Sequence, residues 1–211
     1  MCKMKQFNDL PFAIKGFSNL ISDHITSGKT CKNCPLFGRG PVILDTNIEY
    51  PAPVHLSIIG LNPGINELET GIPFVGGAGK ILRRYFEPLI ERLNLSYVIY
   101  NAILCHTPNE KSIPDFKKVG RYCSPIVSTI DQYFPSTIKV VLGEKARIIV
   151  GATGGQITRV NGQLINGYFV MIHPSSIQYN PANKVLFEEA MKRLQVLILR
   201  TFDFSGGSQC Q

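Results

Sequence analysis

The chain has 211 residues, of which 44% are hydrophobic and 18% are charged, and its formal net charge is +7. A chain of this length can bury a full core, so we expect a single globular domain. The positive charge favours an anionic partner such as nucleic acid. No apolar run approaches the roughly 18 residues of a membrane span, and the N-terminal residues lack a signal-peptide core. We therefore expect a cytoplasmic (intracellular) monomer without membrane contact, whose cysteines form no structural disulfides.

Helical and strand patterns alternate along the chain. Apolar runs of the buried-strand type occupy residues 55–60, 97–100, 138–142 and 168–172. Helical spacing occupies residues 5–26, 78–95, 114–133, 144–150 and 182–201. Pro88 is expected to end or kink the second of these helices, so that residues 89–95 continue as a separate piece. This alternation predicts one α/β domain with a largely parallel sheet.

The expected domain spans residues 1–211. It divides into an N-terminal helical and cysteine-containing segment at 1–53, an α/β core at 54–201 and a flexible tail at 202–211. A glycine-rich loop of about twenty residues follows the first core strand, and loops of that length are usually functional.

Polar residues follow three of the predicted strands, namely Asn62, Asn101 and His173. The carboxyl ends of parallel strands lie on one edge of a sheet, where ligands of open α/β folds bind. We therefore expect these three side chains to meet in one pocket.

The cysteines suggest a metal centre. Cys31 and Cys34 form a C-x₂-C pair, in which two thiolates readily chelate one centre, whereas Cys105 and Cys123 lie far downstream. Zinc usually takes two close pairs, and one pair with two dispersed cysteines suits an iron–sulfur cubane at least as well. Cys105 and Cys123 can also be read as ordinary buried thiols. The residues alone leave these interpretations open.

Several segments, in this order, resemble the uracil-DNA glycosylase superfamily, most closely its iron–sulfur, family 4-type branch. The resemblance spans roughly residues 31–195. It is carried by C-x₂-C-P-L from Cys31, G-x-x-P-G from Gly60, G-x-P-F-V-G-x-A-G from Gly71, N-x-x-x-C from Asn101, V-x-L-G from Val140 and H-P-S from His173. It implies a single-domain, three-layer α/β/α fold with a mainly parallel four-stranded central sheet. It also implies DNA as the partner and a structural [4Fe–4S] cluster on Cys31, Cys34, Cys105 and Cys123, with zinc less favoured.

The resemblance also implies roles in a base pocket. Phe74 lies where the family places its stacking aromatic residue. Asn101 can pair with a carbonyl and an N–H of a pyrimidine. His173 would stabilise the negative charge that develops on the departing base. Gly60 and Leu61 belong to the same substrate-binding loop.

The pair Leu61-Asn62 departs from the family 4 pattern, which has Glu followed by a small residue. The sequence Gly-x-Asn-Pro-Gly is similar to the mismatch-specific and single-strand-selective branches, in which the Asn orients the attacking water. A neutral amide can position water but cannot accept its proton, so we expect slower turnover than with Asp. Glu67 could bind water or shape the loop. Gly64 replaces a bulky aromatic residue that, in the most uracil-restricted branch, blocks pyrimidine C5.

The loop after His173 is expected to contact DNA. Ser175 and Ser176 can bond phosphates, and Ile177 aligns with the position where the superfamily inserts an apolar wedge into the base stack. Simple packing is the alternative interpretation for Ile177.

The sequence thus predicts a monofunctional DNA glycosylase that flips out uracil, or a related 5-substituted pyrimidine, and hydrolyses it to leave an abasic site. One alternative is a glycosylase for bulky modified pyrimidines of viral DNA, such as hydroxymethylated or glucosylated bases, acting in defence. Another is a non-catalytic binder of DNA or DNA damage.

Overall fold

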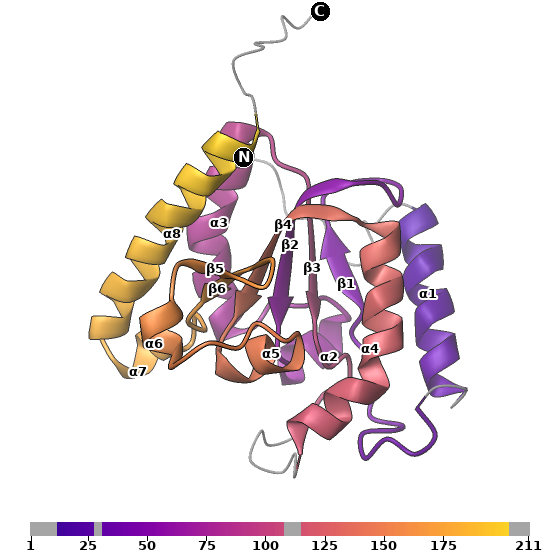
Figure 1. The fold of residues 1–211 in the computed structure, drawn as a ribbon. Coiled ribbons are helices and arrows are strands. Elements are labelled where there is room, and N and C mark those ends of the chain that lie inside the picture. The colour runs from indigo at the N-terminus through magenta and orange to yellow at the C-terminus, as the bar shows by residue number, and fades with distance from the viewer. Residues whose placement is uncertain (1–11, 28–30, 108–114, 203–211) are drawn as a thin grey trace, which may run out of the picture.

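The computed structural model describes residues 12–27, 31–107 and 115–202, and Figure 1 shows its fold. The helices and strands are, in chain order, α1 (Phe12–Thr26), β1 (Leu44–Thr46), β2 (Val54–Gly60), α2 (Ile65–Thr70), α3 (Gly77–Leu93), β3 (Tyr97–Asn101), α4 (Phe116–Tyr133), β4 (Ser136–Leu142), α5 (Glu144–Ile149), α6 (Ile157–Val160), β5 (Gln163–Ile165), β6 (Tyr168–Met171), α7 (Ser176–Tyr179) and α8 (Ala182–Thr201).

The strands form one mixed sheet of six, in the order β1-β3-β2-β4-β6-β5. The four inner strands are parallel to one another, and the two edge strands are antiparallel to their neighbours. The predicted α/β domain with a mainly parallel sheet is therefore confirmed, and the four predicted strands are the parallel ones. The sheet is wider than the predicted four strands because β1 and β5 add three residues each, too few to show a periodic pattern.

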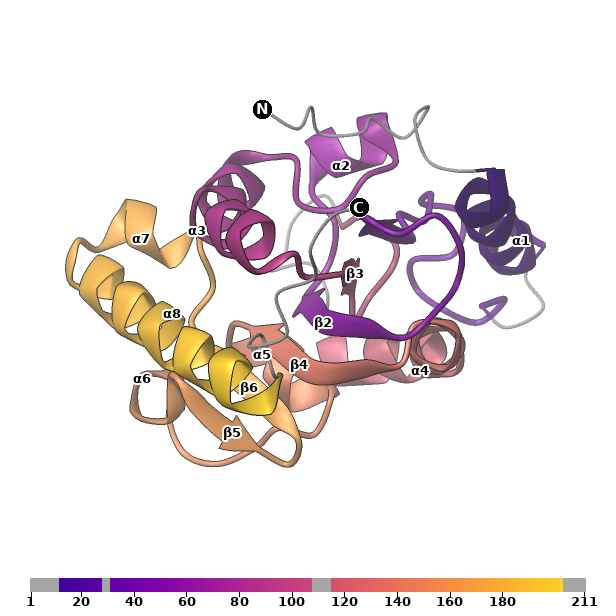
Figure 2. The ribbon, with the colours of Figure 1, turned by 90° about the horizontal axis from the view of Figure 1, so that it is seen from above.

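Helices cover both faces of the sheet (Figure 2). Successive strand residues point to opposite faces, so Ile58 packs with α3 and α8 whereas Ile59 packs with α1 and α4. In the same way, Val140 packs on the face covered by α3 and α8, and Val141 packs on the face covered by α1 and α4. Burial on both faces explains why these strands appear in the sequence as continuous apolar runs. The fold is the expected three-layer sandwich.

Two local expectations were wrong. The glycine-rich loop contains the six-residue helix α2. Pro88 does not end its helix, since α3 runs unbroken for 17 residues. Phe86 and Leu89, on either side of Pro88, are both buried in the core. Their packing keeps the helix continuous through a residue that supplies no backbone N–H.

The short helices α2, α5 and α7 lie beyond the carboxyl ends of the parallel strands, at the lower edge of Figure 1. At the C-terminal end, Phe202 belongs to the packed structure, because its ring meets that of His55 edge to face at 4.7 Å. The remaining tail from residue 203, the predicted helical residues before Phe12, and Pro114 lie outside the described residues. Within the described residues, no helix is long and apolar enough to cross a bilayer.

Candidate active site

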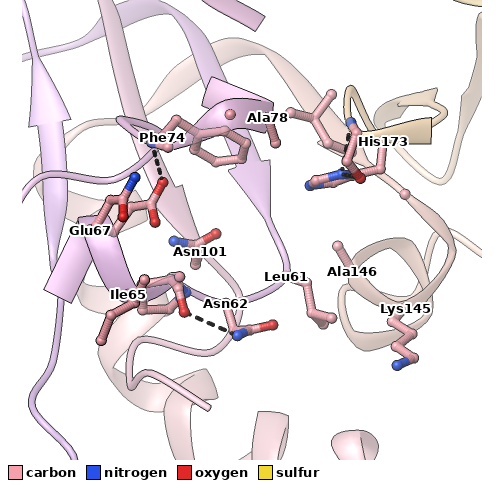
Figure 3. A pocket seen from close by; sticks show the side chains of 18 of the residues that line it. Leu61, Asn62, Ile65, Glu67, Phe74, Ala78, Asn101, Lys145, Ala146 and His173 are labelled. Atoms are coloured by element: carbon pink, nitrogen blue, oxygen red, sulfur yellow. Dashed lines mark hydrogen bonds between the residues drawn. The ribbon is translucent and has the colours of Figure 1, made fainter. Parts of the chain in front are cut away.

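A pocket of about 600 Å³ opens at the carboxyl edge of the sheet (Figure 3). Asn62, Asn101 and His173 all line it, so the expected convergence of the three strand ends is observed. Of the other predicted residues, the pocket includes Leu61, Gly64, Glu67, Phe74 and Ser175. Its wall also contains the first residues of α3 and α5, together with Tyr179 from α7.

Gly60 lies beneath the floor of the pocket and brings two predicted residues together. A Cβ atom at this position would lie 2.3 Å from Asn101 Oδ1 and 2.5 Å from Phe74 Cζ. Only glycine therefore lets the amide and the ring approach the end of β2. Asn101 is 2% exposed and Phe74 is 7% exposed, so their positions are fixed by surrounding atoms.

Phe74 adopts a left-handed backbone conformation, with φ of +59°. This conformation is unusual for a bulky residue and persists only when the surroundings hold it. Gly79 makes room for it, because a Cβ there would lie 1.9 Å from the Phe74 carbonyl oxygen. Arg83 on α3 donates from Nε to that oxygen at 3.0 Å and from Nη2 to the carbonyl of Pro73 at 3.2 Å.

Arg83 is itself buried and paired with Asp45 of β1, with Nη2 and Oδ2 separated by 2.8 Å. Burial raises the pKa of the Asp45 carboxyl, although the guanidinium beside it opposes that change. The pair thus anchors the Phe74 segment to the edge strand of the sheet. Sequence reasoning missed Arg83 because a charged residue on an amphipathic helix is usually read as solvent-exposed, and it missed Asp45 because the short strand β1 was not predicted.

Glu67 shapes the loop, one of its two predicted roles. Its Oε1 accepts hydrogen bonds from the backbone N–H of Val75 at 3.1 Å and of Gly76 at 2.8 Å. Its Oε2 lies 2.6 Å from where a Cβ of Gly64 would be. The space that glycine leaves at residue 64 therefore borders a carboxylate.

The amide of Asn62 has a defined orientation. Its Nδ2 donates to Thr107 Oγ1 at 2.8 Å and to the Pro63 carbonyl at 3.1 Å, and only a nitrogen can face that carbonyl. His106 Nδ1, at 3.0 Å, donates to the same oxygen. Asn62 Oδ1 is buried and has no hydrogen-bond partner among the described residues. The oxygen is therefore available to accept a hydrogen bond from a water molecule or a ligand.

Hydrogen bonds with Ser175 orient the imidazole of His173. Its Nδ1 accepts the backbone N–H of Ser175 at 3.3 Å and lies 2.7 Å from Ser175 Oγ. A backbone N–H can only donate, so the proton of the ring is on Nε2. The ring centroid lies 6.3 Å from that of Phe74. Gly143 permits this position, since a Cβ there would lie 3.1 Å from His173 Cβ.

The predicted DNA-contacting residues have structural partners. Ser175 Oγ is engaged by His173, and Ser176 Oγ donates to the His173 carbonyl at 2.7 Å. Ile177 is half-buried and packs against the core layer formed with α3 and α8. Ser176 and Ile177 do not line the pocket, and their predicted contacts with DNA stay predictions.

The four predicted ligand cysteines are all buried, unpaired by disulfides and gathered in the core layer that contains α1 and α4. Burial, with neighbouring thiolates adding to it, raises the pKa of Cys105 to about 12. Burial raises the pKa of Cys123 to about 12 as well. A cationic centre would offset this cost of ionisation. Within the described part of the chain, no three or more His, Cys, Asp or Glu residues form a group that could hold a metal ion.

Comparison with known proteins defines the class. Residues 48–195 match the family model described as Uracil DNA glycosylase superfamily. This match covers more than half of the chain, which therefore belongs to that superfamily and is a DNA glycosylase.

The branch follows from individual relatives, all named Type-4 uracil-DNA glycosylase. The chain is 28% identical to the protein of Sulfurisphaera tokodaii over 191 residues, which cover 81% of each chain. It is 26% identical to that of Saccharolobus solfataricus, with 84% of each chain covered. It is 30% identical to that of Thermotoga maritima, with 74% of this chain and 82% of the relative covered. The predicted resemblance to the type-4 branch is confirmed.

Proposed function

We propose that this glycosylase excises uracil from DNA by hydrolysis and leaves an abasic site. The observation that carries the proposal is the oriented amide of Asn62, whose buried oxygen has no hydrogen-bond partner among the described residues and whose side chain lines the same pocket as Phe74, Asn101 and His173. The choice of uracil as the excised base rests on the names of the relatives, which are uracil-DNA glycosylases.

Recognition of the base requires a stacking surface and a polar edge. The Phe74 ring supplies the surface, and the Asn101 amide can accept from the pyrimidine N3–H while it donates to a carbonyl. Both side chains are buried, so their geometry is set before the base enters. A preorganised site of this kind loses little entropy on binding.

The reaction replaces the bond between C1′ and N1 with a bond from C1′ to a water oxygen. The electron pair of the broken bond goes to the base, and the water proton passes to solvent. Asn62 Oδ1 can accept a hydrogen bond from the water but has no useful basicity, so departure of the base must run ahead of attack. His173 Nε2–H can donate to the base as negative charge develops there.

The start of α3 contributes to the same effect. Gly76, Gly77 and Ala78 line the pocket at the N-terminus of this 17-residue helix. The positive end of the helix dipole favours a developing anion within its first turn.

The surroundings of Gly64 favour uracil over a bulky 5-substituted base. In the resemblance, residue 64 faces pyrimidine C5, and the Glu67 carboxylate borders the space beside it. Glu67 is fixed by two backbone donors, so a hydroxymethyl or glucosyl group would have to displace it.

We further propose that Cys31, Cys34, Cys105 and Cys123 hold a [4Fe–4S] cluster. The four thiols are buried and influence one another electrostatically, which fits such a centre. In a [4Fe–4S] cluster each of the four irons takes one cysteine ligand. When bound, the cluster would cross-link the segment before β1, the segment after β3 and helix α4. We also propose that the protein acts as a monomer, which size-exclusion chromatography with light scattering would test.

The first test is abasic-site formation on oligonucleotides containing uracil, 5-hydroxymethyluracil, mismatched thymine, or hydroxymethylated or glucosylated cytosine, each single- and double-stranded. Uracil should be cut best. Cleavage of a modified cytosine with uracil intact would replace the proposal by the defence function. Binding without any cleavage would replace the proposal by a non-catalytic function in binding DNA or DNA damage.

The second test addresses Asn62 directly. Asn62→Ala should lower kcat by about tenfold or more, because one positioning group is lost while DNA binding is retained. Thr107→Val removes the hydroxyl that orients the amide and should lower kcat to a smaller extent. Thr107→Ser keeps the hydroxyl and serves as the matched control. Unchanged kcat in Asn62→Ala would remove Asn62 from the mechanism.

A further inference from the structure

The backbone just before His173 is held by a distant side chain. Strand β5 begins with Gln163 opposite Val170 of β6, so continuing the antiparallel register would place residue 161 opposite Ile172. Asn161 occupies this place, between α6 and β5, and its side-chain Oδ1 accepts the N–H of Ile172 at 3.0 Å. The side-chain oxygen thus stands in for a strand carbonyl beyond the end of β6.

The other end of the Asn161 amide is tied to α8. Its Nδ2 donates to the Leu186 carbonyl at 2.7 Å, and the side chain is buried. The orientation of the amide is fixed, because the partner of its oxygen is a backbone N–H, which can only donate. Gly162 lets the chain approach α8, since a Cβ there would lie 3.3 Å from Ala190 Cα. Asn161 therefore fastens the residue before His173 to a helix of 20 residues.

We propose that Asn161 is a positioning residue for His173, on which it acts through the backbone of Ile172. Ser175 and Ser176 bond His173 from its C-terminal side. Asn161 fixes the chain on the N-terminal side, so the imidazole is held from both directions. This inference rests on the proposed function, in which His173 donates to the departing base. A displacement of a catalytic group by about 1 Å can lower the rate up to about hundredfold.

A double-mutant cycle on the single-turnover rate with a uracil oligonucleotide tests this role. Asn161→Leu keeps most of the side-chain volume but removes both hydrogen bonds, and should lower the rate about ten- to hundredfold. In the His173→Ala background the same change should lower the rate less than about twofold, because the group that Asn161 positions is already absent. Equal losses in the two backgrounds would overturn the proposal.

Asn161→Asp separates positioning from stability, and it serves as the test if Asn161→Leu fails to fold. It keeps an acceptor for the Ile172 N–H but loses the amide donor to Leu186. Its Tm should therefore fall while most of the single-turnover rate is kept. A rate as low as that of Asn161→Leu, or a loss of activity through unfolding alone, would overturn the proposal.

Asn166→Leu is the matched control, because Asn166 lies in the turn at the other end of the same hairpin. Its Nδ2 donates to the Gly151 carbonyl at 2.9 Å, and its backbone has a φ of +49°. Leucine would lose the hydrogen bond and strain the turn. This variant should lower Tm without changing the single-turnover rate. A rate that follows Tm alike in the variants of Asn161 and Asn166 would make Asn161 a structural residue only.

The wild type and His173→Ala distinguish failure of this inference from failure of the proposed function. If the wild type cuts uracil and His173→Ala is slow, an Asn161→Leu variant with the wild-type rate would overturn the positioning role alone. A wild type that leaves uracil in place would overturn the proposed function, and the inference with it. A wild-type rate in His173→Ala would overturn the catalytic role of His173 and leave Asn161 nothing to position.

Discussion

The pocket and the four buried cysteines both draw on distant parts of the chain, but by different rules. The pocket gathers residues that follow parallel strands, and topology alone places such residues on one edge of a sheet. The cysteines come from the segment before β1, the segment after β3 and the interior of α4. No general rule of sheet topology brings those three places together. Polar residues after strands can therefore be predicted to meet, whereas buried thiols need the resemblance to a family.

The largest effect is expected at the cysteines. Cys123→Ser should remove one ligand of the proposed cluster, and loss of a structural metal is among the most destabilising single changes, about 4–5 kcal/mol. For a chain of this length, that corresponds to a fall in Tm of roughly 10 °C or more. Iron content, the visible absorption of the cluster and thermal unfolding would check this. A variant that keeps about four irons and the wild-type Tm would contradict the assignment.

The next largest effect is expected at His173 and distinguishes the pocket from the four cysteines. His173→Ala should lower kcat by about 10²–10³, the usual cost of removing one donor to a developing anion, with Tm nearly unchanged. Single-turnover kinetics on a uracil oligonucleotide and thermal unfolding would measure both quantities. Cys123→Ser should lower stability and activity together. The pair of variants therefore tests whether the pocket has a catalytic role and the four cysteines have a structural role. A loss of Tm in His173→Ala as large as in Cys123→Ser would erase that distinction.

The parts of the site that could be predicted are those with a local signal. Apolar runs marked the four parallel strands, and the polar residues after them marked the pocket. Thr107 and His106 gave no such signal, because each acts through one hydrogen bond to a neighbour that only the fold provides. Tyr179 was missed for a related reason, since solvent exposure of an aromatic ring is decided by how α7 packs.

The support of Phe74 could not be predicted either. Its positive φ depends on Gly79, which makes room for its carbonyl, and on the hydrogen bonds from Arg83. These contacts join the segment between α2 and α3 to two residues of α3, and in the sequence Gly79 and Arg83 each have an ordinary helix explanation. Conformational strain of this kind becomes visible only in three dimensions.

A smaller effect is expected when Asp45 and Arg83 are replaced together. Removing one partner alone would leave a buried charge. The double variant Asp45→Leu, Arg83→Met should instead have a free energy of unfolding within about 1 kcal/mol of that of the wild type. Its kcat should still fall by about tenfold or more, because Phe74 loses the donors that hold its backbone. The matched control is Asp131→Leu, Lys139→Met, which replaces the 2.6 Å ion pair joining α4 to β4. If both double variants keep full activity, Arg83 has no positioning role.

The smallest effect is expected at His55, which lies at the edge of the sheet opposite to His173. His55, near the amino end of β2, accepts the Ser96 N–H on Nδ1 at 2.9 Å, and burial lowers its pKa. The unfolded chain therefore binds a proton more readily, near pH 6.5, so this contribution to stability is complete above that pH and is lost as pH falls through it. His55→Asn keeps an acceptor but removes the titration. The difference in Tm between wild type and variant should thus change between pH 7.5 and pH 5, in the sense that the wild type loses more on acidification. A constant difference would show that His55 titrates alike in the folded and unfolded chains.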